Sequence, residues 1–282
     1  MNKKVKIIVD STADIAENII DRFTVVPLTV RFGDEEFVDG ITITNRQFYE
    51  KLIESDVVPT TSQATPDNFE KALKEIIDLD EEAVVITISS TLSGTYQSAV
   101  IAAEEYKDKI FTVDSKSVAI GTGILAELAL KLADEGKNAK EIAEILEKEK
   151  ENIRIVALLD TLEYLKKGGR ISKTTAFAGG LLNIKPVVSF TGGVIEILGK
   201  ARGSKQGNNL LVSEIEKAGG VDFTKPLLLG YTGLSDAMLQ KYIEDSKHIW
   251  DGNTEKLNIA SIGSVVGTHT GPSAVAVAFF KK

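Results

Sequence analysis

The sequence predicts an α/β protein with two domains, and three observations lead to this prediction. In the first half, short apolar runs alternate with amphipathic helical segments, a pattern typical of βαβ units and a parallel sheet. In the second half, apolar runs follow one another more closely, which indicates a mixed or antiparallel sheet. A charge-rich segment at residues 144–154 separates the two patterns. We therefore expect an N-terminal domain over residues 1–152 and a C-terminal domain over residues 153–282.

The apolar runs of the first half predict strands that each end in polar residues. A helical stretch is expected after the first strand, following the polar turn at residues 10–13. The four predicted strands are residues 5–9, 25–32, 83–89 and 110–114.

Three helices of the first half carry recognisable signals. Thr44 and Gln47 have the spacing of a capping box, which predicts a helix start. Thr65 followed by Pro66 predicts an N-cap and a first helical position. A long helical region at about 117–151 is interrupted by the polar sequence DEGKN.

The second half predicts six strands and two helices. Gly192 and Gly193 stand between two apolar runs at the spacing of a tight hairpin turn. Helices are expected at about 204–217 and 235–247. The predicted strands are residues 153–159, 185–190, 193–198, 226–231, 256–263 and 273–280.

Composition excludes several classes of function. The 282 residues carry a net charge of −8, from 33 basic and 41 acidic side chains, so the basic footprint of nucleic-acid binding is absent. The absence of cysteine excludes disulfides, thiolate zinc sites and cysteine nucleophiles, and two histidines are too few for a histidine-built metal site. No segment has the roughly 18 apolar residues of a membrane helix, and the start lacks the apolar stretch of a signal peptide. We expect a cytoplasmic protein without stable membrane insertion.

The most informative segment is ITISSTLSGTYQSA, residues 86–99. It places six hydroxyl residues between Thr87 and Thr95, where a buried strand gives way to a helix. Polar residues also follow two other predicted strands, at 9–12 and 113–117, and PTTSQ at 59–63 precedes a helix in a predicted loop. Ligands bind at the carboxyl ends of parallel strands, so these groups favour a shared site. Hydroxyls, backbone N–H groups and a helix N-terminus suit one modest negative charge such as a carboxylate.

Two other chemistries are weaker interpretations of this segment. Ser93 and His269 could form a hydrolase pair, with Asp114 or Asp160 as the third member, but Thr91 stands where a nucleophile elbow requires glycine. GTGILA at 121–126 fits a loose dinucleotide motif, yet its helical apolar spacing favours close helix packing through its glycines.

Three segments of the second half are candidates for a ligand site. YLKKGGRIS, residues 164–172, is either a helix end stopped by glycines or a basic cluster with a function. The segment 174–186 is apolar and rich in glycine, as expected of a core segment or of the wall of an apolar channel. His269 is expected in a Gly/Thr-rich loop between two strands.

Seven motifs together resemble the DegV family. They occur in the family's order and spacing and extend from residue 9 to residue 272: VDSTAD, PTTSQATPDNF, ISSTLSGTYQSA, YLKKGGRIS, IKPVVSFTGG, KARGSK and VVGTHTGP. The resemblance implies a carrier without turnover of its own that binds a long-chain fatty acid between its two domains. It implies no cofactor, and it implies a dihydroxyacetone-kinase-like fatty acid kinase as the partner that forms an acyl-phosphate for phospholipid synthesis.

The resemblance also assigns roles to residues. Thr61 and Ser93 match the family's carboxylate ligands, and His269 matches the histidine that supports them. Arg202 lies in the region that the family uses to meet its kinase. Ser62, Gly94 and Thr95 are expected as further contributors to the carboxylate site.

Two functions of other classes stay open from the sequence. A hydrolase or acyl-transferase would use Ser93 and His269 and would lose its activity in Ser93→Ala. A nucleotide-binding protein would be stabilised by nucleotide and Mg²⁺. A carrier would show no turnover and would co-purify with lipid.

Overall fold

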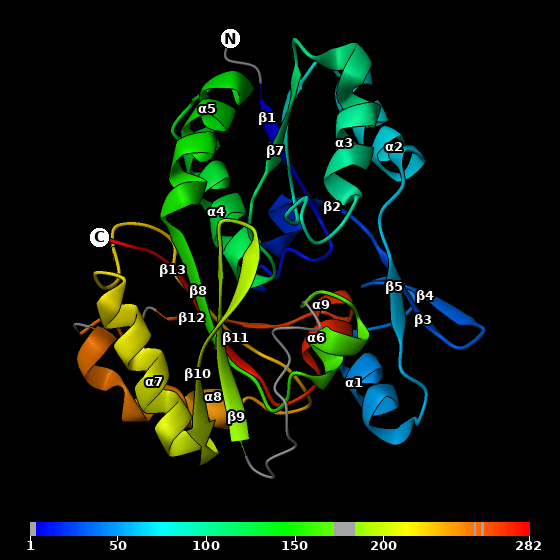
Figure 1. The fold of residues 1–282 in the computed structure, drawn as a ribbon. Coiled ribbons are helices and arrows are strands. Elements are labelled where there is room, and N and C mark those ends of the chain that lie inside the picture. Colours follow the sequence, from blue (N-terminus) through cyan, green and yellow to red (C-terminus); the bar gives the residue numbers. More distant parts are fainter. Residues whose placement is uncertain (1–3, 172–183, 251, 255–256) are drawn as a thin grey trace.

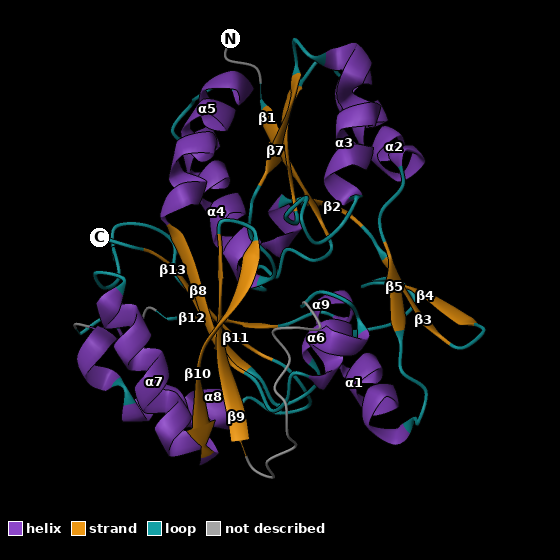
Figure 2. Cartoon of the chain, in the orientation of Figure 1, coloured by secondary structure: helices purple, strands orange, loops and turns teal. Residues whose placement is uncertain are grey.

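The computed structural model describes residues 4–171, 184–250, 252–254 and 257–282, which form two large sheets, one small sheet and the helices around them (Figure 1, Figure 2). Among these residues, no helix is long and apolar enough to cross a membrane.

The first large sheet has the strand order β2-β1-β6-β7, and all neighbouring pairs are parallel. Both of its faces are buried. Ile7 and Val84 belong to the core beneath α4 and α5, whereas Ile8 and Val85 belong to the core beneath α2 and α3. The parallel sheet predicted for the first half is therefore confirmed. Its elements are β1 (Val5–Asp10), β2 (Thr24–Val26), β6 (Glu82–Thr87), β7 (Ile110–Asp114), α2 (Pro66–Asp78), α3 (Thr95–Ala103), α4 (Ile120–Asp134) and α5 (Ala139–Glu149).

The predicted helix starts are confirmed as hydrogen bonds. Thr44 caps α1 (Asn45–Glu54), and its side chain and that of Gln47 bond reciprocally to each other's backbone N–H groups. Thr65 does the same with Asn68 at the start of α2, where Pro66 occupies the first turn. The interruption predicted inside the region 117–151 separates α4 from α5.

The second large sheet has the order β10-β9-β8-β13-β11-β12, in which β11 and β12 are parallel and every other pair is antiparallel. The mixed sheet predicted for the second half is confirmed. Gly192 and Gly193 form the hairpin turn, with φ angles of +59° and +86° that favour glycine. The elements are β8 (Ile153–Leu158), β9 (Ile184–Thr191), β10 (Val194–Arg202), β11 (Leu228–Tyr231), β12 (Asn258–Ser261), β13 (Val275–Phe280), α7 (Gly203–Lys217) and α8 (Ala237–Asp245).

Helix α4 lies between the two large sheets and contacts both (Figure 1). It contacts β1 and β6 of the parallel sheet, and β8, β11 and β13 of the mixed sheet. Two glycines allow this close approach, because a Cβ at Gly121 would collide with Ile155 and a Cβ at Gly123 would collide with the backbone of Asp14. The packing role predicted for the glycines of GTGILA is confirmed.

A small antiparallel sheet, β4-β3-β5, was not predicted. The segment 25–32 was expected as one strand, which is wrong, since the chain leaves the parallel sheet at Pro27 and pairs elsewhere after it. The segment 59–63 was expected as a loop, which is also wrong, because its centre pairs with the small sheet. The pairing joins residues about 30 positions apart, and no local pattern specifies it. The strands are β3 (Thr29–Phe32), β4 (Glu35–Val38) and β5 (Thr60–Ser62).

Two further expectations are corrected. The helical stretch after the first strand is reduced to a short 3₁₀ turn, η1 (Ile20–Arg22). His269 lies in a short helix, α9 (Ser264–Thr270), and not in a loop, because this segment packs against α1, β3 and β5 and pairs its buried backbone internally. The remaining 3₁₀ helices are η2 (Glu104–Tyr106), η3 (Lys150–Asn152) and η4 (Lys247–Trp250).

The motif YLKKGGRIS does end a helix. α6 (Glu163–Lys167) stops at Gly168, and Gly169 adopts a φ of +71°. Most of the apolar segment 174–186 lies outside the described residues. The division at residues 152 and 153 stays a prediction: β8 begins the second large sheet there, yet α9 packs on elements of the first half.

Candidate ligand-binding site

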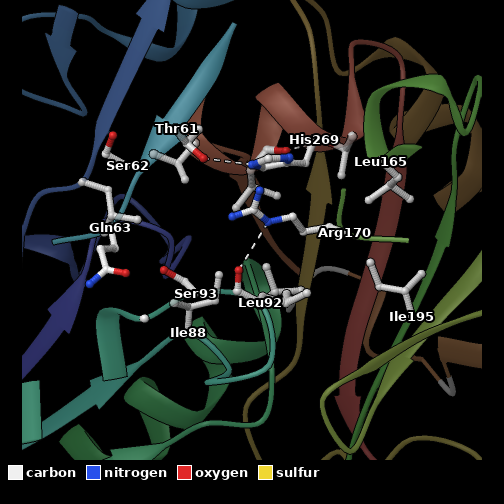
Figure 3. Close-up of a pocket in the computed structure, with 16 residues that line it drawn as sticks. Thr61, Ser62, Gln63, Ile88, Leu92, Ser93, Leu165, Arg170, Ile195 and His269 are labelled. Carbon is white, nitrogen blue, oxygen red and sulfur yellow. Dashed lines mark hydrogen bonds between the residues drawn. The ribbon is translucent and has the colours of Figure 1, made fainter. Parts of the chain in front are cut away.

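A cavity of about 380 Å³ lies where the end of the parallel sheet meets the small sheet, α6, α9 and the β9–β10 hairpin (Figure 3). One wall is polar and the remainder is apolar. None of the described residues that line it is acidic. The lining residues are Leu28, Thr61, Ser62, Gln63, Ile88, Leu92, Ser93, Gly94, Val118, Leu165, Arg170, Ile195, Val265, Val266, His269 and Thr270.

The hydroxyls of residues 87–95 have different roles. Thr87 donates to its neighbour's carbonyl, and Ser90 donates to Asp114. Thr91 donates to the carbonyl of Gly193 at the tip of the β9–β10 hairpin, which links the two halves of the chain. Ser93 alone of the six lines the cavity. The segment therefore mostly holds its own loop in place, and one hydroxyl remains for a ligand.

Contacts with Thr95 fix the position of the Ser93 side chain. Its Oγ lies 2.9 Å from Oγ1 of Thr95 and accepts from the Thr95 backbone N–H. Gly94 precedes α3, which has no side-chain cap, so the partial positive charge of the helix N-terminus lies next to Ser93. A Cβ at Gly94 would collide with the Gln63 side chain, so glycine lets that amide reach the cavity.

Thr61 and His269 form the opposite side of the polar wall. Oγ1 of Thr61, on β5, lies 3.0 Å from Nε2 of His269, near the end of α9 (Figure 3). Burial, with a smaller contribution from the positive charge of Arg170, lowers the pKa of His269 to about 4. The imidazole is therefore neutral at pH 7, and its buried Nδ1 has no hydrogen-bond partner among the described residues.

Close packing fixes the position of this histidine. A Cβ at Gly168, at the end of α6, would collide with Nδ1 of His269, and a Cβ at Gly271 would collide with the ring of Tyr164. The glycines of YLKKGGRIS and of GTHTGP thus let α6 and α9 meet. These two motifs therefore also have a packing role, which the sequence did not indicate.

Arg170 is the residue that sequence reasoning missed. Its Nε donates to the carbonyl of Leu92 at 3.3 Å, and its Nη1 donates to the carbonyl of Gly168 at 2.6 Å. Figure 3 shows the guanidinium between His269 and Ser93, facing the cavity. The signal was its place in the YLKKGGRIS motif, but only the tertiary fold brings α6 to the loop after β6. Arg170 supplies a permanent positive charge to the wall, whose other described lining residues are neutral.

A second, smaller cavity adjoins the first on the side of the mixed sheet. Its volume is about 70 Å³, and its surface is apolar throughout. Five residues line both cavities: Val118, Leu165, Ile195, Val266 and Thr270.

The predicted site residues separate into three groups. Thr61, Ser93, Gly94 and His269 line the cavity as expected. Ser62 also lines it, although Figure 3 shows its hydroxyl pointing away from His269. Two lie elsewhere: Thr95 is fully buried behind Ser93, and Arg202 is exposed at the end of β10.

The geometry does not support the hydrolase interpretation. Ser93 bonds to Thr95, whereas His269 bonds to Thr61, so no serine–histidine pair is formed. The two candidate third members are engaged elsewhere, because Asp114 accepts from Ser90 and Asp160 pairs with Lys185. The described residues also contain no group of three or more acidic or histidine side chains placed to hold a metal ion.

Three buried carboxyl groups, those of Asp10, Asp14 and Asp39, influence one another, and two of them bond to the N-terminal end of α9. Asp14 accepts from the backbone N–H of Gly263 at 2.8 Å, and Asp39 accepts from the hydroxyl of Ser264. Burial raises the pKa of all three carboxyls, that of Asp14 most clearly, and their mutual repulsion adds to the effect for Asp10 and Asp14. Of the two VDSTAD carboxylates, Asp14 bonds to the N-terminal end of α9, whereas Asp10 accepts from the backbone N–H groups of Thr12 and Ile88, and neither lines the cavity.

Comparison with known proteins agrees with this geometry. The family model described as "Uncharacterised protein, DegV family" matches residues 4–282. A DegV domain-containing protein of Clostridium acetobutylicum is 35% identical, with 99% of this chain and 100% of that protein covered. Among solved structures, a DegV family protein from Thermus thermophilus described by its fatty acid binding is 28% identical, with a TM-score of 0.87 and 99% and 100% of the two chains covered.

A third similar protein is named for a kinase system. The Fatty Acid Kinase (Fak) B3 protein of Streptococcus pneumoniae, solved with linoleic acid, is 26% identical with a TM-score of 0.84, and 99% and 100% of the two chains are covered. The family match and these relatives extend over nearly the whole chain. The chain described here belongs to the DegV family.

Proposed function

We propose that this protein binds a long-chain fatty acid, with the carboxylate at the polar wall of the large cavity and the alkyl chain in the apolar space beyond it. One observation carries the proposal: a polar wall, with no acidic side chain among its described residues, opens directly into an apolar cavity between elements from both halves of the chain. Similar solved proteins described as binding fatty acids support it.

The polar wall has the donors that a buried carboxylate needs. A carboxylate removed from water must have its lone pairs met by hydrogen bonds. Thr61 and Ser93 supply hydroxyls, with Ser62, Gly94 and Thr95 as neighbours that support them. The neutral His269 orients the hydroxyl of Thr61, and Arg170 adds positive charge. The hydroxyl donors favour the anion without fixing it in a bidentate salt bridge.

The apolar part of the site supplies most of the affinity. Burial of an alkyl chain contributes about 0.8 kcal/mol per methylene, so a dozen methylenes outweigh one head group. This balance favours a long acyl chain over a short carboxylic acid. No cofactor is needed for such binding.

We further propose that the protein is a carrier subunit that presents the bound acid to a dihydroxyacetone-kinase-like fatty acid kinase. The carboxylate oxygen attacks the γ-phosphorus of ATP on the kinase, the bond to the β–γ bridging oxygen breaks, and acyl-phosphate and ADP are formed. The similarity to the Fak B3 protein supports this partnership. Ser93 bonds to Thr95 and His269 bonds to Thr61, which agrees with a protein that holds its ligand while another performs the chemistry. Arg202, exposed at the end of β10, is the proposed docking residue.

Mass spectrometry of the purified protein, native and then after solvent extraction, tests the binding proposal. We expect one fatty acid per chain in the native spectrum and its free acid in the extract. Purified protein that contains no fatty acid and also fails to bind added palmitic or oleic acid would contradict the proposal.

A phosphorylation assay tests the carrier proposal separately. With a fatty acid kinase and ATP, the loaded protein should yield acyl-phosphate, whereas the protein alone should release no acid from a chromogenic ester. Arg202→Ala should retain its lipid and lower acyl-phosphate formation, and Lys241→Ala, an exposed site on α8, is the matched control. Equal activity of the two variants would remove Arg202 from the docking role.

A further inference from the structure

The smaller apolar cavity continues from the larger one, with which it shares five lining residues. Since Thr61, Ser93 and Arg170 line the larger cavity and not the smaller one, an alkyl chain that begins beside them must pass the residues common to both cavities before it enters the smaller one. Figure 3 shows two of them, Leu165 and Ile195, on the side of the mixed sheet, beyond Arg170. The smaller cavity is therefore the natural position for the methyl end of the chain.

Two alanines on adjacent strands line this smaller cavity. Ala157 of β8 and Ala276 of β13 face each other directly in the antiparallel register, and both line only the smaller cavity. Val188 of β9 is the register partner of Ala157 on its other side and lines the same space. Larger side chains, Ile155 and Phe190, also line it. Space remains where the two small side chains meet.

We propose that the Ala157–Ala276 pair sets the maximum length of the acyl chain that this protein retains. This inference rests on the proposed fatty-acid binding and adds to it the residues that select among chain lengths. A volume of about 70 Å³ is small beside the 380 Å³ of the larger cavity, so a change of a few carbon atoms in this wall changes the room for the methyl end. Protein interiors are packed too closely for the surrounding sheet to compensate freely.

Substitutions in both directions test the pair. Ala276→Leu and Ala157→Leu each add three carbon atoms to the wall and should shift the preferred acid to a chain shorter by two to four carbons. Each methylene withdrawn from apolar contact lowers affinity by about fourfold, so an acid that cannot retract by three methylenes should bind about 60-fold more weakly. Val188→Ala removes two carbon atoms and should shift the preference to longer chains.

Ala278→Val is the matched control. Ala278 lies two residues along β13 from Ala276, is fully buried in the same core, and does not line the smaller cavity. Added volume there should lower the melting temperature and leave the chain-length preference unchanged.

The measurement is competition by lauric, myristic, palmitic and stearic acids against a fluorescent fatty acid, on delipidated protein, with melting temperatures recorded in parallel. A shorter optimum in the leucine variants and a longer one in Val188→Ala support the inference. If the leucine variants do not fold, the Val188→Ala result decides. Binding with an unchanged optimum in every folded variant overturns the inference, whereas wild-type protein that binds none of these acids overturns the proposed function itself.

Discussion

The two ends of helix α9 have opposite electrostatic character. At its N-terminus, the buried side chains of Asp14 and Asp39 accept hydrogen bonds from Gly263 and Ser264, so the protein itself supplies the carboxyl groups there. At its other end, His269 faces a cavity lined by hydroxyls and Arg170, without an acidic side chain among its described lining residues. Carboxyl groups of the protein thus lie at the N-terminus of this short helix. The polar wall of the cavity, which suits the carboxylate of a ligand, lies at its other end.

The difference shows how the same chemical group is handled in two ways. A permanent carboxylate can be satisfied by fixed backbone N–H groups and by the positive end of a helix. A ligand carboxylate must enter and leave, and the hydroxyls proposed to bind it lie on separate elements, β5 and the loop after β6. Substitutions that act on one end, the other end, or both can distinguish these roles.

The largest effect is expected when both ends are disturbed together. Gly267 lies in the middle of α9, and a Cβ there would lie 2.6 Å from the Tyr49 hydroxyl oxygen and 2.7 Å from the Phe48 ring. Both rings are fully buried, so Gly267→Ala should lower the free energy of unfolding by about 3 kcal/mol, at the upper end of typical overpacking costs. Urea denaturation measures the loss.

Gly199→Ala is the control for this effect, because its Cβ would meet only the end of the Leu210 side chain, which can rotate away. Equal losses in the two variants would show that α9 is not held tightly between its two ends.

Ser93→Ala isolates the ligand end. Removal of one hydrogen bond to a charged group costs about 1.5–3 kcal/mol, so fatty-acid affinity should fall by about tenfold to a hundredfold. The free energy of unfolding of the ligand-free protein should change by less than about 1 kcal/mol, since Ser93 bonds only within its own loop.

Ligand competition and urea denaturation of the same samples measure the two quantities. Ser90→Ala, whose hydroxyl bonds to Asp114 outside the cavity, is the matched control and should retain full affinity. Wild-type affinity in the Ser93→Ala protein would show that Ser93 does not contribute to the proposed carboxylate site.

Asp14→Ala isolates the carboxylate end. It leaves the buried N–H of Gly263 without an acceptor, which costs about 1–3 kcal/mol of unfolding free energy. Asp14→Asn keeps an acceptor oxygen at that position and should cost less than half as much. Thermal and urea denaturation compare the two variants, and an Asn variant as unstable as the Ala variant would indicate that charge, and not the hydrogen bond, is what α9 requires.

The pH dependence of stability should have opposite signs at the two ends. The pKa of His269 falls from 6.5 to about 4 on folding, so the unfolded chain takes up the proton first, and stability decreases as pH falls from about 6.5 to 4. The pKa of Asp14 rises above 3.8 on folding, so the folded protein takes up that proton first, and stability increases as pH falls through the raised pKa towards 3.8. The raised pKa values of Asp10 and Asp39 act in the same direction as that of Asp14.

Because these contributions oppose each other, the net change of unfolding free energy with pH should be the smallest of the four effects predicted in these paragraphs, after those of the Gly267, Ser93 and Asp14 substitutions. Urea denaturation between pH 4 and pH 7 should show a steeper acid loss in Asp14→Asn than in wild type, and a flatter one in His269→Gln. Identical pH profiles of the three proteins would contradict the assigned directions.

Local sequence patterns predicted the elements whose causes are local. The capping boxes at Thr44 and Thr65 and the hairpin at Gly192 follow from hydrogen bonds or turn angles within a few residues, and the structure confirms them. Strand β5 and helix α9 could not be predicted in this way. β5 depends on pairing with a strand about 30 residues away, and α9 depends on packing against α1.

The candidate site shows the same division. The motifs identified Thr61, Ser93 and His269, and the structure brings all three to one cavity. Arg170 was missed because its position depends on the approach of α6 to the loop after β6. Thr95 is predicted from the sequence to contribute to the carboxylate site, yet it lies behind Ser93. Residues two apart in a tight turn need not face the same cavity.

The sequence by itself determined the α/β class, the order of most strands and helices, the absence of cysteine chemistry and the motifs of the DegV family. Only the tertiary structure decided which polar residues face the cavity and which support the fold. Asp14 of VDSTAD follows strand β1 as the hydroxyls follow β6, yet it bonds to the N-terminal end of α9, away from the cavity. Strand periodicity records burial along one element, whereas a site is formed by the distances between several elements.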